Sequence, residues 1–139
     1  MTKAIPYLLV KNGKRAIELY KNLFGAKLIE HQPFNKEIGK EFGMHEDFDY
    51  ENSTMHAKLD IDGALIYLAD NMLGHSSPGN VEITLDLEKK EKIDSIYKKV
   101  KENDFKITME LEKTFWGAWF ARFVDSEGIG WQLNYTENQ

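Results

Sequence analysis

Apolar and polar residues follow the same order twice along the chain. The first half opens with an apolar run at 4–10, AIPYLLV, which predicts a strand. The next segment predicts a helix, with Asn12 as its cap and Gly25 as its end. The apolar residues of this segment share one helical face: Ala16, Ile17, Tyr20, Leu23 and Phe24.

Three further segments complete the first half. AKLIEHQPF, at 26–34, alternates between apolar and polar residues and predicts a strand. Pro33 indicates either that this strand lies at a sheet edge or that it ends there. The polar, glycine-bearing stretch 35–52 is interpreted as a long loop that serves either as a lid or as a dimer contact. MHAKLDIDGALIYLAD, at 55–70, predicts two strands around a turn, because an Asp-Gly pair at 62–63 is typical of hairpins.

The second half repeats this order. NVEITLDL, at 80–87, alternates strictly between polar and apolar residues and predicts a strand. A helix is expected over 88–104, followed by a strand at 105–111 and a hairpin at 119–135. The apolar residues of this helix recur at helical spacing: Ile93, Ile96, Tyr97 and Val100.

The chain therefore reads as two modules of about 65 to 75 residues, each with the order strand, helix, strand, strand, strand. We place the modules at 1–72 and 79–139, joined by a glycine- and serine-bearing linker at 73–78. The fold class is α+β, built from two tandem βαβββ modules. Aligning the two hairpin turns makes Tyr67 and Gln132 equivalent positions.

Composition narrows the class of protein. A chain of 139 residues that is 42% hydrophobic and 29% charged suits one globular domain. It contains no cysteine, which excludes disulfides and thiolate sites and makes the cytoplasm the expected compartment. The net charge of −5, with both signs interspersed, argues against a nucleic-acid partner. No apolar run is long enough to span a membrane, and the first residues lack a secretory pattern.

Three stretches in this order resemble the vicinal oxygen chelate superfamily, the glyoxalase/bleomycin resistance/dioxygenase-like proteins. They are YLLVKNGKRAIELYKNLFGAKLI at 7–29, MHAKLDIDGALIYLAD at 55–70 and FWGAWFARFVDSEGIGWQLN at 115–134. Within the superfamily they look like the PhnB-like subgroup, whose members often carry a demethylubiquinone-methyltransferase label. The resemblance implies curved sheets around a cavity with helices outside, and a homodimer. The modules would pair either within one chain or across the dimer.

Metal-dependent relatives hold a divalent ion with a His or Glu on the first and fourth strand of each module. Carried over by position, these sites fall at Ile5, at Tyr67, at Asn80 or Glu82, and at Gln132. Isoleucine, tyrosine and a neutral amide leave at most one carboxylate, which is too few ligands for a transition metal. We therefore expect no metal and no cofactor. A new metal site from His45, Glu46, Asp47 and His56 is a weaker alternative, because the loop gives no rigid spacing.

Two titratable residues are candidates for a site. His56 shares a strand face with Lys58, where it would donate hydrogen bonds to a ligand, act as acid or base, or bond to neighbouring backbone. Glu82 would meet Gln132 and Arg122 as a general base or an anchor, or form a structural pair. For Arg122, an internal partner such as Asp125 or Glu82 is favoured over a ligand.

Alternation separates the aromatic residues near the C-terminus. It places Phe120 and Arg122 on the cavity side, Trp119 towards a helix or a partner chain, and Trp131 towards the helix layer. Trp116 precedes the strand and is a candidate for closing the cavity mouth.

Three functions follow from these observations. The first is a metal-free protein that binds a small, partly apolar or aromatic ligand. Its expected lining is Tyr7, Leu9, His56, Tyr67, Glu82, Trp116, Phe120, Arg122 and Gln132. The second is an enzyme, a lyase, dioxygenase or methyltransferase-like protein, that uses Glu82 and His56 as acid and base or a weak metal site. No glycine-rich nucleotide loop supports a methyltransferase. The third is a structural or interaction protein.

Overall fold

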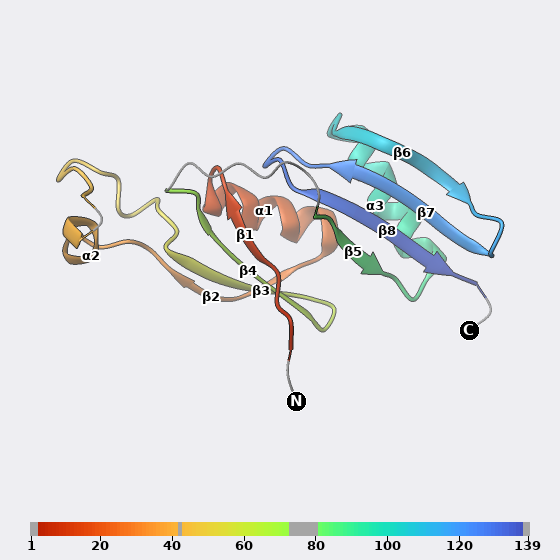
Figure 1. The fold of residues 1–139 in the computed structure, drawn as a ribbon, viewed down its shortest axis with the longest axis horizontal. Coiled ribbons are helices and arrows are strands. Elements are labelled where there is room, and N and C mark those ends of the chain that lie inside the picture. Colours follow the sequence, from red (N-terminus) through yellow and green to blue (C-terminus); the bar gives the residue numbers. More distant parts are fainter. Residues whose placement is uncertain (1–2, 42, 73–80, 138–139) are drawn as a thin grey trace. The chain divides into compact units, whose positions relative to one another are not determined.

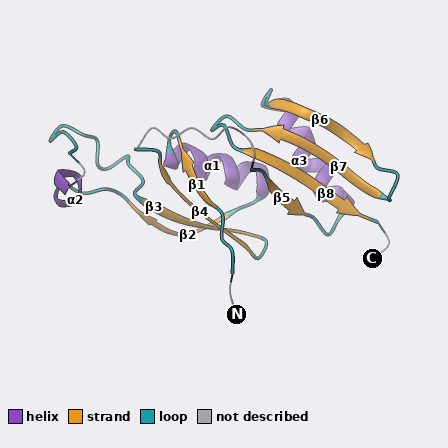
Figure 2. Cartoon of the chain, in the orientation of Figure 1, coloured by secondary structure: helices purple, strands orange, loops and turns teal. Residues whose placement is uncertain are grey.

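The computed structural model describes residues 3–41, 43–72 and 81–137 and divides the chain into two units, Met1–His75 and Ser76–Gln139. The expected linker at 73–78, His75 and Asn80 lie outside the described residues. Each unit contains a four-stranded mixed sheet and one long helix that runs across one face of that sheet (Figures 1 and 2). The α+β fold of two βαβββ modules, predicted from the sequence, is confirmed.

The first unit follows the predicted order with one addition. Its elements are β1 (Tyr7–Val10), α1 (Gly13–Phe24), β2 (Lys27–Gln32), α2 (Lys36–Glu41), β3 (His56–Ile61) and β4 (Ala64–Asp70). The sheet order is β1-β4-β3-β2, with β1 parallel to β4 and the other pairs antiparallel. β2 is an edge strand, as Pro33 predicted.

The second unit repeats this topology. Its elements are β5 (Ile83–Asp86), α3 (Lys90–Glu102), β6 (Lys106–Lys113), β7 (Ala118–Val124) and β8 (Gly130–Thr136). The sheet order is β5-β8-β7-β6, and β5 is parallel to β8. The internal repeat therefore extends to the pairing of the strands.

The cores lie between each sheet and its helix. The predicted face of α1 is buried, and the rings of Tyr20 and Phe24 stack with centroids 5.7 Å apart. In α3, Ile93, Ile96 and Val100 are buried, whereas Tyr97 lies at the edge. Because side chains alternate across a strand, each sheet places most of its apolar residues against the helix and most of its polar residues on the opposite face. That opposite face carries most of the candidate residues.

The predicted elements differ from the observed ones in two places. β1 begins at Tyr7 rather than at residue 4, since Pro6 has no N–H to donate to a strand ladder. The prediction of a loop throughout 35–52 is wrong for Lys36–Glu41, which form α2. The side chain of Asn35 accepts a hydrogen bond from the backbone N–H of Ile38 and caps this short helix.

The hairpin turns are as expected. Asp62 and Gly63 both have positive φ, 49° and 96°, which is the backbone that a two-residue hairpin turn requires. None of the described helices combines the length and apolar character that crossing a bilayer requires.

Candidate functional site

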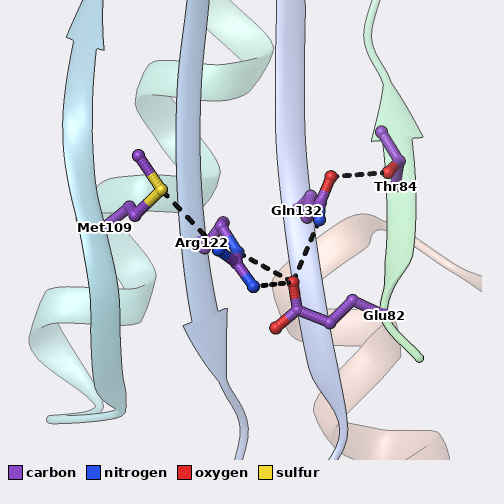
Figure 3. A network of polar contacts seen from close by, with 5 residues as sticks. All are labelled: Glu82, Thr84, Met109, Arg122 and Gln132. Carbon is purple, nitrogen blue, oxygen red and sulfur yellow. Dashed lines mark hydrogen bonds and ion pairs between the residues drawn. The ribbon is translucent and has the colours of Figure 1, made fainter. Parts of the chain in front are cut away.

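The polar face of the second unit holds a continuous side-chain network (Figure 3). Glu82 immediately precedes β5, Arg122 lies on β7, and Gln132 lies on β8. The Arg122 guanidinium donates from Nε to Glu82 Oε1 at 2.8 Å, and its Nη2 lies 2.8 Å from the same oxygen. The Gln132 amide donates to that oxygen from Nε2 at 3.0 Å. The predicted meeting of Glu82 with Arg122 and Gln132 is therefore present, and Glu82 is the internal partner of Arg122.

A second residue of β5 fixes the Gln132 amide. The Thr84 hydroxyl donates to Gln132 Oε1 at 2.9 Å, and Thr84 and Gln132 are register partners in the parallel β5–β8 pair. Because an ionised carboxylate only accepts hydrogen bonds, the amide must present Nε2 to Glu82 and Oε1 to Thr84. Gln132 thus holds Glu82 from one side, while Arg122 holds it from the other.

These contacts keep Glu82 ionised. The hydrogen bond from Arg122 lowers the pKa of the Glu82 carboxyl, burial opposes this effect, and the Gln132 amide and the charge of Arg122 lower the pKa further. A carboxylate with a lowered pKa is a poor proton acceptor at neutral pH. The geometry therefore suits Glu82 to anchoring rather than to general-base catalysis.

Glu82 lies flat against β8 because residue 130 has no side chain. A Cβ added to Gly130 would approach Glu82 Cγ and Oε2 to 3.0 Å. Gly130 and Gln132 share one face of β8 by alternation, as the sequence predicted. The glycine is thus part of the arrangement that places the carboxylate.

An exposed apolar side chain lies beside the network. Arg122 Nη1 points at the Met109 sulfur on β6, 3.8 Å away, and Met109 is 46% exposed. Phe120 shares the face of Arg122 by the alternation of β7 and is only partly buried. Apolar surface therefore adjoins a charged pair, which is the composition of many small-molecule sites.

The polar face of the first unit holds a separate cluster of rings. The Tyr7 hydroxyl lies 3.0 Å from His56 Nδ1. The Tyr67 ring meets the His56 ring edge-on at 5.2 Å and the Tyr7 ring at 6.2 Å. Burial raises the pKa of the Tyr7 phenol, so that this group remains a protonated hydrogen-bond donor. Three of the predicted lining residues thus lie together on neighbouring strands.

Two charged residues of this cluster had no assigned role in the sequence analysis. Glu30 on β2 lies 4.0 Å from His56 Nε2 and 3.6 Å from Lys58 Nζ, and Lys58 Nζ lies 5.4 Å from the centroid of the Tyr67 ring. Glu30 and Lys58 are register partners in the antiparallel β2–β3 pair. The sequence placed Lys58 on the face of His56. It could not place Glu30 in the cluster, because that depends on the pairing of β2 with β3, which a single sequence does not give.

The remaining candidates are exposed or turned away. Leu9 lies on the face of Tyr7 by alternation and is 41% exposed. Trp116, between β6 and β7, is 61% exposed and contacts the ring of Phe115. It lies outside the Glu82 network. Trp131 is buried, as predicted, and Lys90 of α3 lies over the Trp119 ring at 4.3 Å, which places Trp119 on the helix side.

Strand register decides which residues occupy the metal positions of the resemblance. Tyr7 pairs with Tyr67 in β1–β4, and Thr84 pairs with Gln132 in β5–β8. Ile5 and Glu82 lie two residues before Tyr7 and Thr84, just ahead of the two first strands, so Glu82 rather than Asn80 is the equivalent of Ile5.

The four positions do not fit a divalent transition metal. The side chain of Ile5 has no donor atom, Tyr67 carries a phenol in place of an imidazole or carboxylate, and Gln132 has an amide whose oxygen accepts from Thr84. The carboxylate of Glu82 is paired with Arg122. Among residues 3–41, 43–72 and 81–137, no group of three His, Asp or Glu side chains is arranged to hold a metal ion.

Comparison with solved structures finds the same fold in several proteins. PA1353 from Pseudomonas aeruginosa is 25% identical, with a TM-score of 0.76 over 99% of this chain and all of the other. A putative 3-demethylubiquinone-9 3-methyltransferase, a PhnB protein from Bacillus cereus, is 20% identical, with a TM-score of 0.76 over 97% of this chain and all of the other. The fosfomycin resistance protein FosX from Listeria monocytogenes is 14% identical, with a TM-score of 0.68 over 97% and 93%.

A search of curated protein sequences returned no match. A family model matches residues 4–133, which include every candidate residue and all the strands and helices except the last three residues of β8. The chain belongs to the Glyoxalase/Bleomycin resistance protein/Dioxygenase superfamily.

Proposed function

We propose that this protein binds a small, partly apolar or aromatic molecule without a metal ion, as a PhnB-like member of its superfamily. The observation that carries the proposal is the ion pair of Glu82 with Arg122, at 2.8 Å, in a position where the resemblance implies a metal ligand. A fixed cation already neutralises this carboxylate. A divalent ion would have to displace Arg122 or lie beside it, and two cations at such separation repel each other.

The chemistry around the pair suits an organic ligand. Met109 and Phe120 offer apolar contact in the second unit, and the rings of Tyr7, His56 and Tyr67 offer it in the first. Aromatic side chains supply a large contact area at a small cost in conformational entropy, and their polar atoms give direction. Each sheet face therefore presents apolar area with a few oriented polar groups, which is the usual composition of a ligand site.

A fragment screen tests this proposal. Protein made without a histidine tag would be titrated with a library of small aromatic compounds in excess EDTA, and binding would be followed by thermal shift and by amide chemical shifts. We expect hits that raise the unfolding temperature and perturb residues near Arg122 or Tyr67. Arg122→Met should weaken the hits that perturb residues near Arg122, whereas Arg15→Met, at the exposed second arginine on α1, should not. Hits that appear only when a divalent cation is added would contradict the proposal.

One observation favours acid–base catalysis as a second function. The Tyr7 hydroxyl lies 3.0 Å from His56 Nδ1, which is within reach for proton transfer, and the Glu30 carboxylate lies 4.0 Å from Nε2 as a nearby negative charge. Glu82 fits this role less well because its pKa is lowered. Exchange of C–H hydrogens next to a carbonyl into deuterated water would test it, with His56→Gln as the inactive variant. Equal exchange by the two proteins would exclude His56 as the base.

A further inference from the structure

The two oxygens of Glu82 have different surroundings. Arg122 Nε, Arg122 Nη2 and Gln132 Nε2 all approach Oε1 (Figure 3). Oε2 receives no hydrogen bond from the described residues. In the same part of the chain, every buried side-chain nitrogen or oxygen has a hydrogen-bond partner. Oε2 is therefore not completely buried, although the Glu82 side chain as a whole is only 12% exposed. It is a fixed, charged acceptor with unused capacity.

Arg122 has N–H groups that Glu82 does not engage. A guanidinium carries five N–H groups in a rigid plane. Two of its nitrogens are engaged by Glu82, and the third, Nη1, meets among the described residues only the Met109 sulfur, at 3.8 Å. A thioether is a weak acceptor, so a ligand oxygen would replace it at little cost. The Arg122 side chain is 36% exposed, which leaves room for such an approach.

We propose that the Glu82–Arg122 pair recognises a neutral, planar ligand group that carries an N–H donor next to a C=O acceptor. A secondary cyclic amide on an aromatic ring is the simplest example. Its N–H donates to Glu82 Oε2, and its carbonyl accepts from Arg122. This inference rests on the proposed binding function and names the ligand class of that site.

Charge excludes the simpler ligands. A ligand carboxylate would compete with Glu82 for Arg122, and a ligand ammonium would compete with Arg122 for Glu82. Displacing either partner leaves the other charge without its counterpart in a partly desolvated place, which costs more than the new contact returns. A neutral donor–acceptor edge uses Oε2 and the spare N–H groups together and displaces neither partner.

Gln132, Thr84 and Gly130 are positioning residues in this scheme. Gln132 and Thr84 hold Oε1 in place, and Gly130 leaves space for the carboxylate to lie against β8. Moving Glu82 by a few tenths of an ångström would misalign Oε2 with the ligand N–H. The preference for an N–H group should therefore depend on Gly130 as well as on Glu82.

The test compares 2-quinolone with N-methyl-2-quinolone, which keeps the rings and carbonyl but lacks the N–H donor. Binding of both would be measured by NMR titration in excess EDTA. We expect the wild type to prefer 2-quinolone by about tenfold or more, because a site that hydrogen-bonds an N–H rejects the analogue that lacks it. Glu82→Gln should reduce the preference to near unity. Glu18→Gln, on the exposed side of α1, should preserve it.

Each result decides a different question. Equal binding of the two quinolones to the wild type would overturn the inference and leave the binding function standing. The same holds if other aromatic fragments bind and neither quinolone does. If no aromatic compound binds, both proposals fall. Gly130→Ala keeps the Glu82 carboxylate chemically intact. It is the alternative variant for this test if Glu82→Gln does not fold. We expect it to lower the preference severalfold, and an unchanged preference would contradict the role of the pair.

Discussion

Single residues set the chemistry of the second unit. Glu82 immediately precedes β5, and its charge is compensated by Arg122 from β7 and oriented by Gln132 from β8. These two strands lie far from Glu82 in sequence, and the fold brings them beside it. The partners of Glu82 were predicted because alternation and the hairpin alignment placed all three residues on one face. The sequence could not predict that Arg122 and Gln132 both approach Oε1 rather than Oε2, because this depends on side-chain geometry.

The Glu82–Arg122 pair should stabilise the protein in a pH-dependent way. The pKa of Glu82 in the folded protein is lowered from its ordinary value of 4.5, so its contribution is complete above that value and is lost as the pH falls through the folded pKa. Glu82→Gln should lower the free energy of unfolding by about 1–2 kcal/mol at pH 7, after discounting for the partial exposure of Arg122. Urea unfolding followed by tryptophan fluorescence from pH 7 to pH 3 would measure this.

The quantity to compare at each pH is the difference in the free energy of unfolding between the wild type and Glu82→Gln. It should be constant from pH 7 to about pH 5 and should shrink below pH 4.5, because the protonated wild-type side chain then resembles the amide. A difference that stays constant down to pH 3 would show that Arg122 does not hold the charge.

Substitution of Gly130 by alanine should affect ligand preference much more than it affects the stability of the protein. The φ of Gly130 is not in the left-handed region, so alanine is compatible with the backbone there, and the main contact of the new Cβ is with the flexible Glu82 side chain at 3.0 Å. We expect Gly130→Ala to change the free energy of unfolding by less than about 1 kcal/mol, since a strand gains from losing a glycine about what the contact costs. A loss of several kcal/mol in urea unfolding would mean that Glu82 cannot move.

Among the elements, the β7–β8 hairpin depends on one buried carboxylate. Asp125 Oδ1 accepts from the backbone N–H groups of Glu127 and Ile129 at 2.8 and 3.1 Å, and its Oδ2 accepts from Trp131 Nε1 at 2.8 Å. The turn and the core tryptophan are thus tied to the same side chain. The sequence analysis placed the turn correctly but considered Asp125 as a partner of Arg122, which the structure pairs with Glu82 instead.

Asp125→Asn should therefore be strongly destabilising. The amide NH₂ would face at least one of the three donors and leave it unsatisfied in a buried place, at a cost of about 2–4 kcal/mol. The matched control is Asp60→Asn in the first hairpin, where Asp60 accepts one exposed hydrogen bond from the Gly63 N–H. This variant should lower the free energy of unfolding by less than about 1 kcal/mol. Chemical unfolding of both variants measures the contrast. Equal losses would mean that the buried network is not what holds the turn.

The order of elements could be predicted, but some of their ends could not. Helix α1 carries all its signals locally, namely an asparagine cap, an apolar face and a terminal glycine with φ of 71°. Helix α2 carries few, because Gly39 and a polar composition indicate a loop. Gly39 fits closely against the Tyr50 ring, and no local pattern reveals this contact. Elements held by distant contacts are the ones that sequence periodicity misses.

For the whole molecule, the repeat explains how one fold carries two different polar faces. Both units have the same strand order and equivalent register, yet one face holds Tyr7, His56 and Tyr67, and the other holds Glu82, Arg122 and Gln132. The shared topology fixes the backbone positions, and the side chains at those positions differ. The two units therefore present different side-chain chemistry on one repeated frame.

Metal removal should leave the protein unchanged. Because the residues at the four metal positions do not form a ligand set, excess EDTA should not alter the unfolding temperature or the binding of aromatic fragments. Differential scanning fluorimetry with and without EDTA would measure the first, and NMR titration the second. A fall of several degrees on chelation would reveal a metal that contributes to folding.

A titration with Mn²⁺ tests the central claim most directly. Mn²⁺ is paramagnetic and broadens the NMR signals of amides near its binding site. At one equivalent, we expect no selective broadening around Tyr67, Glu82 and Gln132, because Arg122 occupies the only carboxylate among the four positions. Selective loss of these signals at stoichiometric Mn²⁺ would contradict the account.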